Sequence, residues 1–298
     1  MNRNFKSGRS GRRMLKKPLR KGRPSVRKKS SEKKIITLKK RPATVRHRDT
    51  ALPRSNPRGQ DMPAEIRLNR FIANAGVCSR READKYIAAG LVTVNGKVVS
   101  EMGVKVKRTD DVRLDGRRLV AEKKIFLLLN KPKGFVTTTE DPKAGKNVMD
   151  LLKGACQERI YPVGRLDKNT TGILLFTNDG ELSDRLTHPS HRIKKIYQVT
   201  LDKHVTKNDI LKIAEGIELE DGPVAADAIS FIDPADKSQV GIEIHSGRNR
   251  IVRRIFEHLG YRVKKLDWVY FAGLTKKNLP RGKWRLLSHN EVSFLKMK

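Results

Sequence analysis

The hydrophobic pattern of the chain changes abruptly near residue 63. Residues 1–62 are polar and basic, contain several prolines and hold few large apolar residues. A segment of this composition cannot bury enough apolar surface to offset the entropy cost of ordering. We therefore expect residues 1–62 to form a disordered basic tail, with regular structure beginning near Ile66.

Two short helices are predicted directly after the tail. One face of the first helix is apolar, with residues at spacings of three and four: Leu68, Phe71, Ile72 and Ala75. Gly76 ends this helix. Ser79 and Glu82 form a capping box that starts a second helix over 80–89, and Gly90 ends it.

A β-hairpin follows the helices. Residues 91–94 and 97–99 read as strands, and Asn95-Gly96 between them favours a type I′ turn. We place the end of this first domain, 63–122, after a closing strand and turn at 113–116. Several basic residues lie off the apolar helix face and are candidate RNA contacts: Arg67, Arg70, Arg80, Arg81 and Lys85.

The second domain, 123–298, is predicted to be of the α+β class. Strand patterns occur at 125–130, 134–138, 173–177, 196–202, 225–231, 239–245 and 261–266. Helical patterns occur at 147–152, 181–187, 207–213 and 250–259. Because helices do not regularly separate the strands, we expect a mixed, mostly antiparallel sheet.

The net charge of the chain indicates a polyanionic partner. The formal net charge is +34, and more than half of the excess lies in the first 60 residues. Lysine and arginine that neutralise phosphates release condensed counterions, which drives association with nucleic acid.

Other sequence features narrow the class of protein. The two cysteines, Cys78 and Cys156, are far apart, and no histidine cluster has ligand spacing. A disulfide scaffold or structural zinc site is therefore not expected. The apolar runs are too short to cross a membrane, and the N-terminus lacks a signal-peptide core. These features suit a cytoplasmic protein.

The segment from Gly164 to Gly180 carries the strongest chemical signal. Arg165 and Asp167 lie on a tight turn that leads into an apolar strand. Asp167 would therefore lie at the edge of a rigid sheet, where a side chain can be held accurately. Taken alone, such an aspartate is more often a turn or cap residue than a catalyst.

The full string Gly-Arg-Leu-Asp-x-x-Thr-x-Gly-Ile-Leu-Leu-x-Thr-Asn-Asp-Gly, starting at Gly164, resembles the signature of RNA pseudouridine synthases. It is most similar to the bacterial ribosomal-RNA branch, the RsuA family. The resemblance implies that Asp167 is the catalytic residue and that the reaction needs no cofactor or metal.

Two further motifs resemble those of the same family. Lys195-x-Tyr197-x-Val199 implies that Tyr197 lies against the target base. The helix after Gly247 has an apolar face, and periodicity alone does not choose between Arg253 and Arg254. The resemblance selects Arg253 as the partner of Asp167, because a guanidinium can favour and orient a carboxylate through two hydrogen bonds.

The first domain resembles the S4 RNA-binding domain, an αL-type helix–turn–helix with a hairpin, through residues 75–83. In the second domain, Arg165, Arg248 and Arg250 are candidate RNA contacts, and Lys131-Pro132-Lys133-Gly134 is expected to set a structural bend. The sequence departs from the family pattern in two places: Ile251 stands where glutamine is common, and Trp268 where arginine is usual.

We therefore predict a cofactor-free RNA pseudouridine synthase that acts as a monomer on ribosomal RNA or a pre-ribosomal particle. Large-subunit RNA is the first expectation and small-subunit RNA the second. Whether the aspartate acts as nucleophile or base stays open. The alternatives are a non-catalytic RNA-binding ribosome-assembly factor and a protein that compacts nucleic acid through its tail alone.

Overall fold

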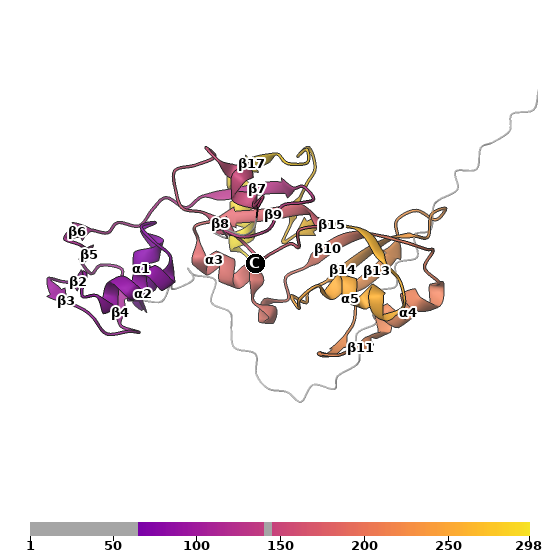
Figure 1. Cartoon of the computed structure of the whole chain (residues 1–298), viewed down its shortest axis with the longest axis horizontal. Helices are drawn as coiled ribbons and strands as arrows, with labels where there is room; N and C mark the ends of the chain where they lie inside the picture. The colour runs from indigo at the N-terminus through magenta and orange to yellow at the C-terminus, as the bar shows by residue number, and fades with distance from the viewer. Residues whose placement is uncertain (1–64, 140–144) are drawn as a thin grey trace, which may run out of the picture. The chain divides into compact units, whose positions relative to one another are not determined.

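The computed structural model describes residues 65–139 and 145–298 (Figure 1). The predicted disordered tail, residues 1–62, lies outside this part. Within the described residues, no helix is long and apolar enough to cross a membrane.

The N-terminal unit contains two short helices and small antiparallel sheets. Strand β1 (Glu65–Arg67) leads into α1 (Leu68–Asn74), and α2 (Arg80–Ala88) follows. The remaining strands are β2 (Val92–Val94), β3 (Lys97–Val98), β4 (Lys105–Lys107), β5 (Val112–Leu114) and β6 (Arg117–Arg118). Strand β4 pairs with β1, and the other four form a sheet in the order β3-β2-β5-β6.

The local predictions for this unit are confirmed in detail. Both hydrogen bonds of the Ser79–Glu82 capping box are present at the start of α2. Asn95 and Gly96 have φ values of 49° and 82°, as a type I′ turn requires. The strands β1, β4 and β6 were not predicted.

A nine-stranded sheet dominates the C-terminal unit, with a main order β13-β14-β10-β15-β9-β7-β17. Its strands are β7 (Phe126–Lys131), β8 (Tyr161–Pro162), β9 (Thr171–Thr177), β10 (Lys195–Leu201), β13 (Ala228–Phe231), β14 (Gln239–Ile244), β15 (Val263–Phe271), β16 (Leu274–Thr275) and β17 (Trp284–Leu286). A separate hairpin joins β11 (Ile217–Leu219) and β12 (Gly222–Val224). The mixed, mostly antiparallel α+β prediction is confirmed.

Helices and 3-10 turns pack on this sheet. They are η1 (Val148–Leu152), α3 (Gly180–Thr187), η2 (Pro189–His191), α4 (Lys207–Glu215), α5 (Ile251–His258) and α6 (His289–Lys296). Asp179, expected in a turn after β9, accepts a hydrogen bond from Leu182 N and caps α3.

Three sequence predictions for the C-terminal unit differ from the structure. Residues 134–138 do not form a strand, because Val136 makes only an isolated bridge to Asn147. The helix predicted at 147–152 is present as a 3-10 helix over Val148–Leu152, with Asn147 as its cap. Residues 225–227 precede β13, which begins at Ala228. Short apolar runs of this kind fit several local structures, and tertiary pairing decides among them.

The C-terminal unit has two hydrophobic cores that meet near the middle of the sheet. One core covers β7 and β9 and includes α3, and the other lies between α4, α5 and the β10–β14 strands. Strand β15 contributes Trp268 to the first core and Leu266 to the second, while Tyr197 packs against both. The described sheet has one parallel ladder, β9–β15, at this junction.

Candidate active site

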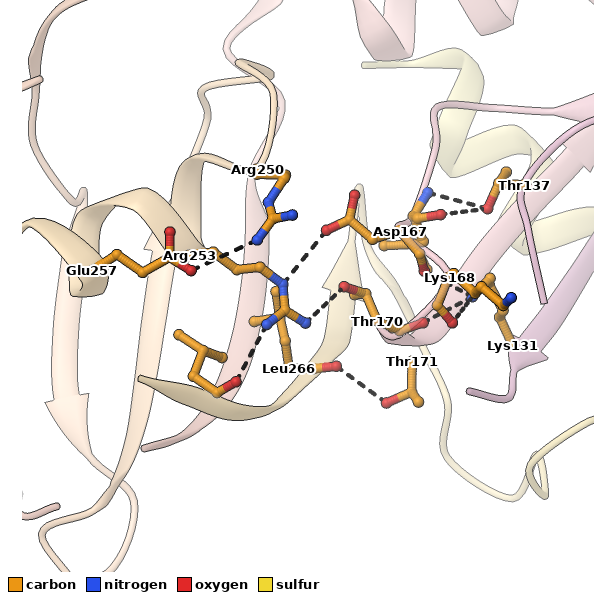
Figure 2. A network of polar contacts seen from close by, with 12 residues as sticks. Lys131, Thr137, Asp167, Lys168, Thr170, Thr171, Arg250, Arg253, Glu257 and Leu266 are labelled. Atoms are coloured by element: carbon orange, nitrogen blue, oxygen red, sulfur yellow. Dashed lines mark hydrogen bonds and ion pairs between the residues drawn. The ribbon is translucent and has the colours of Figure 1, made fainter. Parts of the chain in front are cut away.

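A tight turn before β9 carries Asp167. Gly164 has a φ of +83°, and the amide of Thr170 donates to the carbonyl of Asp167 at 3.0 Å, which closes the turn. The carboxylate itself stays accessible, with 40% of the side chain exposed. The turn therefore fixes the backbone and presents the acid to solvent (Figure 2).

A fully buried lysine, Lys131, supports the backbone of this turn. Lys131 Nζ donates to the carbonyl oxygens of Asp167 at 3.0 Å and Thr170 at 2.9 Å. Thr137 adds a second brace, since its hydroxyl donates to Leu166 O and accepts from Leu166 N. Burial lowers the pKa of Lys131 to about 8, and the nearby charge of Asp167 acts in the opposite direction.

Sequence reasoning missed this role of Lys131. The Lys-Pro-x-Gly motif was expected to set a bend, with a phosphate contact of its lysines as the alternative. The bend does exist, because Gly134 has a φ of +94°, and Lys131 is fully buried. The amide of Gly134 also donates to Lys168 O at 2.8 Å, which joins the bend to the Asp167 turn. The available signal was a lysine close behind the apolar run 125–129.

Arg253 on α5 is the cationic partner of Asp167, as the family resemblance implied. Its Nε lies 3.5 Å from Asp167 Oδ2, and only 11% of the arginine side chain is exposed. The expected two-point contact is absent between these two described side chains. The remaining guanidinium nitrogens instead donate to Thr170 Oγ1 at 3.4 Å and to Val263 O at 3.3 Å (Figure 2).

The neighbouring arginine has a different partner. Arg254 donates to both oxygens of Asp221, at 2.7 and 2.8 Å. These bonds lower the pKa of Asp221 to about 2. The tertiary structure therefore separates two arginines that helical periodicity could not distinguish.

Tyr197 on β10 lies in the same cleft. Its ring stacks on Trp268 with centroids 5.7 Å apart and an interplanar angle of 12°. Burial, and secondarily the charge of Asp167, raises the pKa of the Tyr197 hydroxyl well above its usual range. The ring is therefore a neutral phenol at ordinary pH, which suits stacking and disfavours a phenolate base.

Asp167 and Tyr197 line one cleft with a volume of about 470 Å³, and Arg253 approaches Asp167 from α5 beside it. Its other walls include Trp268, the Gly164–Thr170 turn and residues 246–252 before and within α5. Volumes in this range are typical of small-ligand sites. The sequence-predicted trio of Asp167, Tyr197 and Arg253 is thus brought together from three separate elements.

A second buried lysine supports the opposite wall of the cleft. Lys195 Nζ donates to the carbonyls of His245 and Ser246, each at 3.3 Å. Burial lowers the pKa of Lys195. Its contacts fix the start of the loop that carries Arg248 and Arg250.

The predicted RNA-contacting arginines of the cleft differ in their partners. Arg165 is exposed on the Asp167 turn. Arg248 lies 3.4 Å from Asp221 and donates to Gly222 O at 2.9 Å, whereas Arg250 lies 3.6 Å from Glu257. Arg248 and Arg250 therefore already have protein partners at the cleft wall.

The basic residues of the N-terminal unit are mostly accessible. Arg80, Arg81 and Lys85 are exposed on α2, whereas Arg70 on α1 is half-buried. Arg67 is exposed but ends β1, so the expectation that all five basic residues lie on two helices is wrong. The cause is that α1 begins one residue later, at Leu68.

Within the described ranges, no three histidine, cysteine, aspartate or glutamate side chains are grouped to hold a metal ion.

Comparisons with known proteins identify the families to which the two domains are similar. Residues 125–258 match a family described as RNA pseudouridylate synthase, and residues 66–112 match the S4 domain. The chain is 42% identical over 233 residues to ribosomal large subunit pseudouridine synthase B of Bacillus subtilis, covering 77% of this chain and 95% of the relative.

Two other similarities are consistent with the first. Dual-specificity RNA pseudouridine synthase RluF of Escherichia coli is 35% identical, over 77% of this chain and 78% of the relative. A crystal structure of a pseudouridylate synthase has a TM-score of 0.56 and 31% identity, covering 77% of this chain and 99% of its own.

Proposed function

This chain belongs to the RsuA family of RNA pseudouridine synthases with an S4 domain, and we propose that it isomerises a specific uridine of ribosomal RNA with Asp167 as its catalytic residue. One observation carries this proposal. An accessible carboxylate on a braced turn lies 3.5 Å from a nearly buried guanidinium, in a cleft that also contains an aromatic ring.

The reaction rearranges bonds within one nucleotide. The N1–C1′ bond breaks, the detached uracil rotates, and C5 bonds to C1′; C5 then loses a proton and N1 gains one. Atoms and electrons balance without an oxidant or donor, which agrees with a site built from a carboxylate, a guanidinium and a phenol.

Each side chain has a defined part in this proposal. Asp167 acts on the ribose, by bonding to C1′ or by taking the C2′ proton, because a carboxylate can stabilise an electron-deficient sugar carbon. Arg253 holds the carboxylate by charge and geometry. Tyr197 stacks on the extruded base, a contact that contributes about 1–3 kcal/mol and offsets part of the cost of extrusion.

Accessible cations would position the RNA. We assign backbone contacts to Arg67, Arg80, Arg81 and Lys85 of the S4 domain and to Arg165 beside the catalytic turn. Arg70, Arg248 and Arg250 stay in the proposed contact set, with the last two exchanging carboxylate partners for phosphates. We place the S4 domain at residues 63–122 and the catalytic domain at 123–298.

Large-subunit ribosomal RNA is the proposed substrate. The Bacillus subtilis relative is named for the large ribosomal subunit, and it aligns over nearly its whole length. Ribosomal RNA as substrate implies that the enzyme works in the cytoplasm, and we propose that it acts as a monomer.

The test compares wild type with Asp167→Ala on unmodified ribosomal RNA transcripts and pre-ribosomal particles. Carbodiimide modification and primer extension should reveal one pseudouridine with wild type and none with the variant. Equal RNA binding by both proteins is the control for folding. If wild-type protein modifies no position on either kind of substrate, the non-catalytic assembly factor becomes the better explanation.

A further inference from the structure

Trp268 lies on β15, between β10, which carries Tyr197, and β9, which follows the Asp167 turn. On β15 it is the direct cross-strand partner of Tyr197 on β10. On the other side of β15 it pairs with Gly172 on β9, the strand that follows the Asp167 turn. Trp268 thus pairs with both β9 and β10.

A β-bulge creates the pairing with Tyr197. The register runs from Ile196 opposite Tyr270 to Tyr197 opposite Trp268, so Val269 has no partner on β10. A bulge re-aims side chains, and bulges are common beside active sites. A regular ladder would have placed Val269 opposite Tyr197.

The contact between the two rings is a stack. Their planes differ by only 12°, and the indole also packs on Phe271 at a centroid distance of 4.7 Å. Trp268 is 3% exposed, and its Nε1 has no hydrogen-bond partner among the described residues. Packing and stacking therefore set the plane of the indole.

Gly172 lets β9 approach this residue closely. Its φ is +118°, and a Cβ at this position would overlap the backbone nitrogen and oxygen of Trp268. The backbone of Trp268 is therefore held against the strand of Asp167, while its ring is held against Tyr197. Trp268 therefore contacts both the strand that follows the Asp167 turn and the ring of Tyr197.

We propose that Trp268 is a positioning residue that fixes the plane of Tyr197 and thereby presents the target base to Asp167. This inference rests on the proposed function. A base that stacks on Tyr197 takes its plane from that ring, and the ring takes its plane from the indole. The stacked pair of Trp268 and Tyr197 would thus orient the target base, instead of the Tyr197 ring alone.

The activity test compares Trp268→Leu with Trp268→Phe, which retains an aromatic plane. At saturating ribosomal RNA transcript, the leucine variant should lose roughly 10- to 100-fold in single-turnover rate, because small misplacements of a reacting group are costly. RNA affinity should change little, and the phenylalanine variant should recover most of the rate. Trp284→Leu is the matched control, since Trp284 does not line the cleft.

A spectroscopic test needs no activity. The chain has two tryptophans, so Trp284→Phe leaves Trp268 as the only indole. In that background Tyr197→Leu should change the near-ultraviolet circular dichroism of Trp268 in RNA-free protein. This readout separates a failure of the positioning role from a failure of the proposed function, which would leave even wild type inactive.

Two results would overturn the inference: a wild-type rate in folded Trp268→Leu, or a Trp268 spectrum unchanged by the loss of Tyr197. If the leucine variant unfolds, Trp268→Met supplies a second non-aromatic side chain of greater flexibility. A wild-type rate in that variant would equally exclude the positioning role, and a reduced rate with unchanged affinity would support it.

Discussion

Single side chains at the Asp167 turn perform separable tasks. Asp167 is accessible, Arg253 approaches it from α5, and Lys131 binds the turn through its carbonyl oxygens. The two cations act differently, because Arg253 contacts the acid itself while Lys131 contacts only the backbone that carries it. Replacing Arg253 and replacing Lys131 should therefore have different effects on the protein.

Arg253→Lys should reduce activity much more than Arg254→Lys. A lysine cannot reach Asp167, Thr170 and Val263 together, as the guanidinium of Arg253 does. Charge-assisted contacts of this kind contribute about 1.5–3 kcal/mol, or roughly 10- to 100-fold in rate. The measurement is the single-turnover rate at saturating RNA. Equal losses at the two positions would contradict the assignment of Arg253.

Lys131 should make stability depend on alkaline pH. Its folded pKa of about 8 lies below the ordinary value of 10.5, so between these values the unfolded chain binds more protons. The stability that neutral Lys131 contributes is therefore fully present above about pH 10.5. It is lost as the pH falls from about 10.5 to about 8, and the loss in the free energy of unfolding amounts to at most about 3 kcal/mol.

Urea unfolding between pH 7 and 10 checks this prediction. The wild type should gain stability with rising pH relative to Lys131→Met. Lys133→Met, in the same motif but exposed, is the control and should follow the wild-type curve. A constant difference between wild type and Lys131→Met across this range would contradict it.

At the scale of elements, local signals predicted local structure well. The Ser79–Glu82 box and the Asn95-Gly96 turn were predictable because their hydrogen bonds or dihedral angles involve neighbouring residues. The failed strand at 134–138 and the unpredicted α6 depend on packing partners far along the chain. Strand pairing in particular cannot be judged from one strand alone.

Gly172→Ala should disrupt the junction between β9 and β15. The added methyl group would overlap the Trp268 backbone, so the strands must separate, at a cost we place above about 3 kcal/mol. Gly134→Ala is the matched control, because Gly134 also has a positive φ but a Cβ added there would meet nothing within 4 Å among the described residues. It should lose only about 1–2 kcal/mol of stability.

Those two variants can be compared by urea denaturation and by activity. We expect Gly172→Ala to lose activity even under conditions where it remains folded. Similar unfolding midpoints for the two variants would show that the close approach is not required.

For the whole molecule, charge and site geometry address different aspects of RNA recognition. We expect the basic tail to supply long-range attraction that is independent of RNA sequence. The cleft is formed by the Asp167 turn, β10, β15 and α5, and we propose that it acts on a single nucleotide. Affinity and site choice should therefore be separable.

Deleting residues 1–60 should weaken RNA binding and flatten its dependence on salt, because fewer counterions are released. The modified position should stay unchanged. Filter binding at several salt concentrations, together with primer-extension mapping, measures both effects. Loss of all RNA binding would favour the tail-only alternative, and a moved modification site would show that the tail selects the target.

The sequence alone determined the fold class and the two helices and hairpin of the N-terminal unit. Through family resemblance it also led to the prediction that Asp167, Tyr197 and Arg253 form the site. Such features follow from short-range periodicity, capping and motif spacing. Tertiary structure decided that Arg253 touches Asp167 while Arg254 binds Asp221, that Lys131 braces the turn, and that Trp268 stacks on Tyr197. These contacts join strands and helices distant in sequence, and only the packed sheet fixes which side chains meet.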